Sequence, residues 1–86
     1  MVEFIGEPVS VEARERPDGR LLPSAFSWQG RRYVIRSWGR EGPDSGRTGY
    51  CYLVQTAGPE SWELCHDATS GAWTLARRWP GRYAAV

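Results

Sequence analysis

The most reactive side chains in this chain belong to two cysteines, Cys51 and Cys65, and a single histidine, His66. Thiolate and imidazole groups are common zinc ligands, and they can also act together as the nucleophile and base of an enzyme. Adjacent residues of a strand point to opposite faces of a sheet, so Cys65 and His66 would not face one ion without a bulge, and a fourth ligand is missing. We therefore expect no catalytic residue, no metal site and no cofactor. An enzymatic role would require His66 or Cys65 to lie beside a carboxylate in a pocket.

The cellular compartment follows from what the sequence lacks. No apolar run approaches the roughly 18 residues of a membrane span, and no charged and then apolar signal peptide stands at the start. These features predict a cytoplasmic protein without a membrane partner. In that setting Cys51 and Cys65 are expected to be reduced thiols. If their strands pair in one particular register, the two cysteines lie opposite each other and a disulfide can form on oxidation.

Arginines interleaved with aromatic residues are the other candidate for chemistry. Small curved sheets that bind single-stranded nucleic acid combine a cationic groove with rings on which bases stack. We predict phosphate contacts at Arg32, Arg36 and Arg47 and a stacking platform at Trp38. Two alternatives stay open: solvated edge arginines around core rings, or a surface that takes a peptide strand by edge pairing. The full set of candidate binding residues is Arg32, Arg36, Trp38, Arg40, Arg47, Arg77 and Arg78.

Net charge does not decide between these functions. The chain carries a formal charge of +1, so no global field attracts it to nucleic acid or membrane. The positive excess is local, since residues 25–56 hold five arginines against two acids. All basic residues are arginine and asparagine is absent. Because Lys and Asn have A/T-rich codons, a high-GC genome accounts for this bias, and the arginine count alone is not evidence for nucleic-acid binding.

The stretch Phe26–Trp38 predicts a β-hairpin that positions many of these residues. Gln29-Gly30 is its two-residue connection, which pairs Trp28 with Arg31 and Phe26 with Tyr33. The face expected in the core carries Phe26, Trp28, Tyr33 and Ile35, whereas the other carries Ser27, Arg32, Val34, Arg36 and Trp38.

Further strands follow from alternating apolar residues. A turn near Gly58 places Tyr52 and Val54 against Trp62 and Leu64, and a last strand turns Trp73 and Leu75 inward. Residues 9–14 predict an edge strand, and residues 39–46, rich in Gly, predict a mobile loop. Six strand candidates without a helical period indicate an all-β fold. We expect one domain over residues 1–86, an antiparallel meander of about five to six strands curled into a barrel or half-barrel.

Several segments also carry a family resemblance, and they are Phe4–Pro8, Phe26–Ile35 with Trp38, Tyr50–Val54, Trp62–Asp67 and Gly71–Arg77. Through them the chain resembles a family of small bacterial domains of unknown function, found standalone or at the C-terminus of Y-family polymerase-like mutagenesis proteins. The resemblance implies a setting in DNA repair and gives no catalytic residue to transfer. This chain departs from the family's aromatic pattern at Cys51, Cys65 and His66, which argues against a functional role for these three.

The sequence therefore predicts a non-enzymatic binding module. Its partner is expected to be single-stranded or damaged DNA, or a DNA-repair protein. The alternative is a structural module that is either a monomer or a homodimer joined through exposed strand edges.

Overall fold

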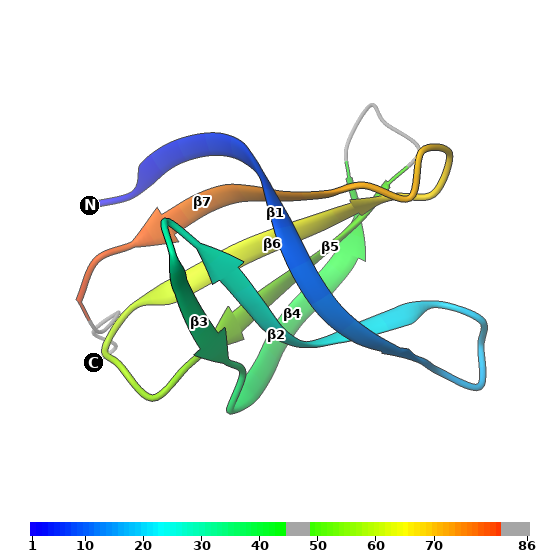
Figure 1. Ribbon diagram of the computed structural model, residues 1–86, viewed down its shortest axis with the longest axis horizontal. Coiled ribbons are helices and arrows are strands. Elements are labelled where there is room, and N and C mark those ends of the chain that lie inside the picture. Colours follow the sequence, from blue (N-terminus) through cyan, green and yellow to red (C-terminus); the bar gives the residue numbers. More distant parts are fainter. Residues whose placement is uncertain (45–48, 82–86) are drawn as a thin grey trace.

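The computed structural model describes residues 1–44 and 49–81, and these ranges form seven β-strands without a helix (Figure 1). This confirms the all-β class, with one strand more than the upper number expected. Among these residues no helix is long and apolar enough to cross a membrane. The strands are β1 (Glu3–Glu15), β2 (Leu21–Trp28), β3 (Arg31–Val34), β4 (Ser37–Pro43), β5 (Gly49–Gln55), β6 (Ser61–Asp67) and β7 (Trp73–Trp79).

The seven strands make one antiparallel sheet in the order β3-β2-β1-β7-β6-β5-β4. β1 lies between β2 and β7 in this order and pairs with both: residues from Glu3 to Val9 pair with β7, and residues from Ser10 to Glu15 pair with β2. By changing partner, this strand turns the sheet back on itself into a half-barrel (Figure 1). β1 is therefore not a terminal strand of the sheet, as an edge strand over residues 9–14 would be, but each of these residues pairs with one neighbouring strand only. Pro8 is tolerated because it lies in the half of β1 that pairs with β7 alone.

The hairpin of β2 and β3 forms as the sequence predicts. Gln29 and Gly30 have φ angles of 52° and 75°, the two left-handed conformations of a type I′ turn. The turn sets the register, so Trp28 lies opposite Arg31 and Phe26 opposite Tyr33. Both central residues must be left-handed here, and glycine supplies one of them without steric cost.

The core lies inside the curled sheet and is built around Trp62. The rings of Phe26, Trp28 and Tyr33 lie 5.1, 5.7 and 4.8 Å from the Trp62 ring, at edge-on or tilted angles that aromatic pairs favour. The side chains predicted to point inward do so, and the buried apolar residues are Ala25, Phe26, Ile35, Tyr52, Val54, Trp62, Leu64, Trp73 and Leu75.

β3 and β4 end the sheet without pairing with each other, which leaves an open seam between β2 and β4. Side chains bridge this seam. The indole Nε1 of Trp38 donates to the Pro23 carbonyl at 2.8 Å, and the Tyr52 hydroxyl donates to the Leu21 carbonyl at 2.6 Å. Arg16 adds an ion pair with Glu41 at 2.6 Å.

Of the stretch predicted as a mobile loop, residues 39–46, the first five residues are strand, and residues 45–46 lie outside the described residues. Residues 39–43 belong to β4 and pair with β5 through a register shift between Trp38 and Glu41. Such a bulge accommodates an extra residue in one strand of an antiparallel pair. The glycines of this stretch do mark an irregular backbone, but the irregularity is a bulge within a strand and not a loop.

Candidate functional site

Arg32, the first predicted phosphate contact, is already neutralised. Its Nε and Nη2 donate to the two carboxylate oxygens of Glu12 at 2.7 and 2.8 Å. This paired hydrogen bond lowers the pKa of Glu12 and raises the pKa of Arg32. Both side chains are exposed, so the pair is screened by water, but a phosphate would still have to compete with Glu12 for the guanidinium.

Arg36 and Arg40 differ from Arg32 because neither guanidinium has an ion pair or hydrogen bond within residues 1–44 and 49–81. Both residues are exposed, and they flank Trp38 along the chain. Arg47, the remaining arginine predicted beside them, lies outside the described residues. We call the segment from Arg36 to Arg40 the β4 strip.

Trp38 lies at the seam with 42% of its surface exposed. Its indole N–H is used by the bond to Pro23, so the ring is held in place across the gap. Trp38 therefore has a structural role that the sequence did not indicate. The exposed remainder of the ring is still accessible to a flat ligand group.

Arg77 and Arg78 have acidic partners within the fold. Arg77 donates from Nε and Nη2 to Glu63 at 2.6 and 3.1 Å, which raises the pKa of Arg77. Arg78 bonds to Glu3 at 3.1 Å and lies over the Trp62 ring at 5.5 Å. Its Nε is buried without a hydrogen-bond partner. Arg78 thus packs over the core aromatic cluster instead of facing a ligand.

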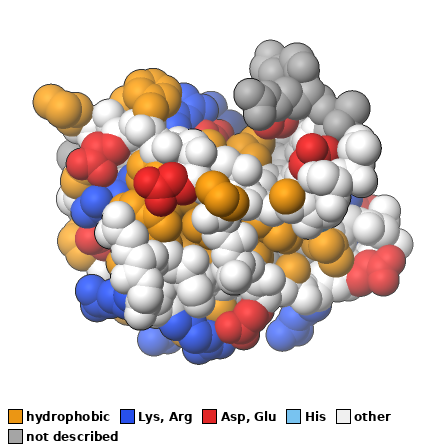
Figure 2. Space-filling view, turned by 45° about the horizontal axis from the view of Figure 1, so that its top comes forward, with side chains coloured by type: hydrophobic (Ala, Val, Ile, Leu, Met, Phe, Trp, Pro, Cys, Tyr) orange, Lys and Arg blue, Asp and Glu red, His pale blue; other side chains and the backbone are white. Residues whose placement is uncertain are grey.

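The six candidates that the structure describes do not form one cationic surface. In the face drawn in Figure 2, basic and acidic side chains are interspersed and no large patch of one sign is present. Of the six candidates that the structure describes, Arg36, Trp38 and Arg40 have no carboxylate partner and are neighbours along the chain. Because of the register shift after Trp38, Arg40 lines the outer face of the sheet beside Leu53, whereas Trp38 lies at the seam. Arg32, Arg77 and Arg78 are each held by a carboxylate from another strand.

The outer face of β4 to β7 is hollowed, which the sequence did not predict. One hollow of about 630 Å³ is lined by residues that include Arg40, Leu53 and Trp79. A second of about 490 Å³ adjoins β1 and contains Cys65 and His66. Both hollows share Asp44, Cys51, Glu63 and Arg77 in their linings. The only sequence indication was alternation, since Cys51, Glu63 and Cys65 fall between core residues of β5 and β6.

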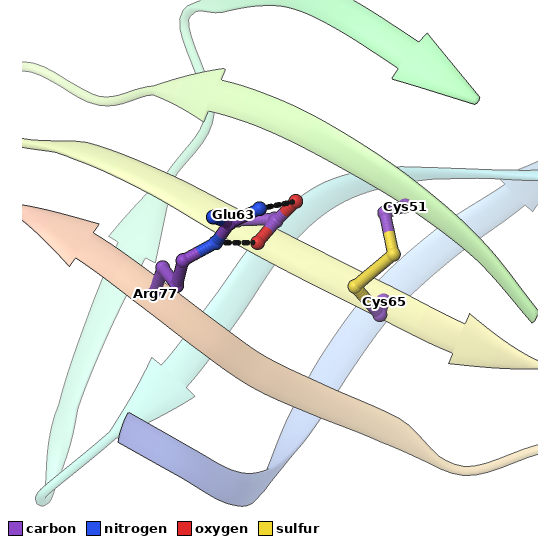
Figure 3. Close-up of a disulfide and its surroundings, with 4 residues drawn as sticks. All are labelled: Cys51, Glu63, Cys65 and Arg77. Carbon is purple, nitrogen blue, oxygen red and sulfur yellow. Dashed lines mark hydrogen bonds and ion pairs between the residues drawn. A yellow bond between two sulfur atoms is a disulfide. The ribbon is translucent and has the colours of Figure 1, made fainter. Parts of the chain in front are cut away.

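Cys51 and Cys65 are joined by a disulfide in this structure, so the expectation of reduced thiols is wrong. The register that would place them opposite each other is confirmed by the pairing of β5 with β6. Figure 3 shows the disulfide on the same sheet as the Glu63–Arg77 pair. Cys65 and His66 were expected to point to opposite faces of the sheet. The His66 ring lies 4.7 Å from the ring of the core residue Trp73, which is consistent with that expectation.

Cys65 does lie near a carboxylate, that of Asp44, within 4.8 Å. Its sulfur is bonded to Cys51, so this structure presents no thiol nucleophile at that point. The other shifted group of note is Tyr52, where burial raises the pKa of the phenol. Tyr52 bridges the seam, and its perturbation has a structural cause.

Comparison of the chain with known protein families, with curated proteins and with solved structures found no match.

Proposed function

We propose that this protein is a non-enzymatic binding module that holds single-stranded nucleic acid along the β4 strip. The observation that carries the proposal is that Arg36 and Arg40 are exposed and have no acidic partner in the described part of the chain. Trp38 lies between them along the chain and exposes 42% of its surface at the seam. Proteins that bind single-stranded nucleic acid combine unpaired cations with exposed aromatic rings.

Arginines without a carboxylate partner are the better phosphate contacts, because at the other arginines a phosphate must compete with a bound carboxylate. A phosphate that approaches Arg32 or Arg77 would have to displace a carboxylate held by two hydrogen bonds. A phosphate that approaches Arg36 or Arg40 displaces only water and counterions. Four residues along a strand span roughly 13 Å at about 3.3 Å per residue, so the two cations are far enough apart to contact different phosphates.

The proposed setting is DNA repair in the cytoplasm, with a repair protein as an alternative partner on the same surface. The DNA-repair setting rests on the family resemblance of the sequence, and the cytoplasmic setting on the membrane span and signal peptide that the sequence lacks. Arg47 was predicted to contribute as well, but the proposal stands on Arg36, Trp38 and Arg40 alone.

The test is a titration of the full chain with single-stranded oligonucleotides at low salt, followed by tryptophan fluorescence and by amide chemical shifts. We expect shifts that concentrate on residues 36–40 and an affinity that falls steeply as salt is added. Unchanged fluorescence and shifts throughout the titration would end the nucleic-acid proposal. Co-purification of a protein that survives nuclease treatment would point to the repair partner instead.

A second candidate is self-association through β4. This strand pairs with β5 and with no other described strand, so one row of its backbone N–H and C=O groups has no strand partner in the described chain. Exposed edges of this kind pair readily with a second strand. Sedimentation over a range of concentrations tests this candidate, because a strict monomer at every concentration excludes it.

A further inference from the structure

Three potential metal ligands converge on the outer face of the sheet. They are the sulfur of Cys51 on β5, the sulfur of Cys65 on β6 and a carboxylate oxygen of Asp44, which follows the last residue of β4. These three atoms all lie within 4.8 Å of one another, and each residue is half-buried. The group combines three separate segments of the chain, so it is a product of the fold.

The position of Asp44 is fixed by the return of the chain from β4 to β5. The Asp44 N–H donates to the Gly49 carbonyl at 2.9 Å, which holds the residue at the start of β5. A Cβ at position 49 would lie 2.9 Å from the His66 carbonyl and 3.4 Å from the Asp44 Cβ. Glycine at this position is what allows Asp44 to approach β5 and β6 so closely.

We propose that, once the disulfide is reduced, the thiolates of Cys51 and Cys65 and the carboxylate of Asp44 bind one Zn²⁺ ion. Reduction by a dithiol breaks the S–S bond, gives each sulfur a hydrogen and leaves the dithiol as its own disulfide. Binding of Zn²⁺ then releases the two thiol protons to solvent and forms two Zn–S bonds and one Zn–O bond. The oxidised protein cannot bind in this way, because the electron pairs needed from the two thiolates are committed to the disulfide.

The geometry suits a tetrahedral ion. Two sulfurs at about 2.3 Å from a tetrahedral zinc are about 3.8 Å apart, and a carboxylate oxygen at about 2.1 Å fits a similar spacing. The three ligand atoms already lie within 4.8 Å of one another, so rotation about the side-chain bonds is the only movement that this arrangement asks of them. Three protein ligands leave the fourth position open, and it faces the hollows that Asp44 and Cys51 line, where a water molecule can enter.

The surrounding charges also favour a divalent cation. Two thiolates and one carboxylate carry three negative charges, which Zn²⁺ reduces to one. Arg77 also lines these hollows, but its positive charge is offset by Glu63. Arg77 holds Glu63 by two hydrogen bonds, so this carboxylate is occupied and is not counted as a ligand (Figure 3). His66 is not counted either, since its ring lies against Trp73.

The test uses the full chain, reduced and then desalted without oxygen, with Co²⁺ as a coloured substitute for Zn²⁺. We expect thiolate-to-cobalt charge transfer and the visible bands of a tetrahedral site, both saturating at one equivalent and both abolished by added Zn²⁺. The oxidised chain should give neither. D44N should weaken Co²⁺ binding at least tenfold, since even outer partners of a metal ligand contribute about 10–100-fold. H66Q is the matched control and should bind as the unaltered chain does.

Two outcomes would overturn the proposal. One is a reduced chain that gives no charge transfer with Co²⁺. The other is a D44N chain whose affinity and visible bands equal those of the unaltered chain, because the two thiolates alone would then be the site. Amide spectra of the reduced chain keep the test informative if reduction loosens the fold. Zn²⁺ must then restore the dispersed spectrum of the folded chain, and failure to restore it counts against the site.

Discussion

The indole N–H of Trp38 on β4 donates a hydrogen bond to the backbone carbonyl of Pro23 on β2, at 2.8 Å across the open seam. This bond connects two strands that do not pair, and it involves the ring that we propose as a stacking platform. Substitutions of Trp38 are therefore expected to affect both the stability of the fold and the binding of a ligand. The two effects can be measured apart if the substitution removes the N–H and keeps an aromatic ring.

Replacement of Trp38 by Phe keeps an aromatic ring and removes the N–H. We expect a loss of about 0.5–1.5 kcal/mol in the free energy of unfolding, the usual contribution of one hydrogen bond. Oligonucleotide affinity should change little, because stacking needs the ring and not its nitrogen. Urea unfolding measures the first effect and fluorescence titration the second. Trp38→Ala serves for comparison and should reduce both.

Charge removal at Arg36 and Arg40 tests the cations of the β4 strip. The double variant R36Q/R40Q should reduce the slope of log affinity against log salt by about 1.4, since each lost phosphate contact on a single strand contributes about 0.7. The control is R32Q/E12Q, which removes the Arg32–Glu12 pair without altering net charge. Equal salt slopes for the two double variants would show that the β4 strip is not where phosphates bind.

Alkaline pH should reveal the burial of Tyr52. The pKa of its phenol is raised in the folded state, chiefly by burial, so the folded chain keeps this proton at a pH where the unfolded chain loses it. Stability from this group is complete below the unfolded pKa of about 10 and is lost as pH rises through the folded value. Y52F cannot titrate, so the difference in unfolding free energy between it and the unaltered chain should change above about pH 10. A difference that stays constant with pH would contradict this account.

Reduction of the disulfide should lower stability without changing the fold. Cys51 and Cys65 are 14 residues apart, and closing a loop of that size stabilises a protein by about 3 kcal/mol at most in the chain-entropy model. Urea unfolding with and without reductant measures the loss, and C51S/C65S should match the reduced chain. The rest of the core does not depend on this bond, so amide dispersion should persist in both forms.

The parts of the fold that follow from local pattern were predictable. Alternating residues and one turn are enough to pair Phe26 with Tyr33 and to set Tyr52 and Val54 against β6. The position of β1 was not predictable in this way, because its two partners are a long-range property and its polar residues suggested an edge. The bulge in β4 was missed for the opposite reason, since three glycines and a proline within residues 39–46 indicate a loop more strongly than a strand.

The candidate site was predictable only in part. Arginines and rings could be found in the sequence, but their carboxylate partners come from distant strands, as Glu12 does for Arg32. The same holds for Asp44, which reaches the cysteines only because β4, β5 and β6 are neighbours in the sheet. The sequence placed Cys51 opposite Cys65 in one of the possible hairpin registers, which the structure has, whereas Asp44 as a third ligand could be recognised only from the fold.

Because Glu3 pairs with Arg78, the first half of β1 cannot form its strand pairing until β7 has been synthesised. Until the last strand leaves the ribosome, half of β1 and one side of β6 have no partner, and both are open to pairing with other chains. A large part of the sheet also joins residues far apart in sequence, which is typical of domains that fold in milliseconds to seconds. We therefore expect chains truncated before Trp73 to aggregate instead of folding, which would make β7 the strand that commits the domain to its native state.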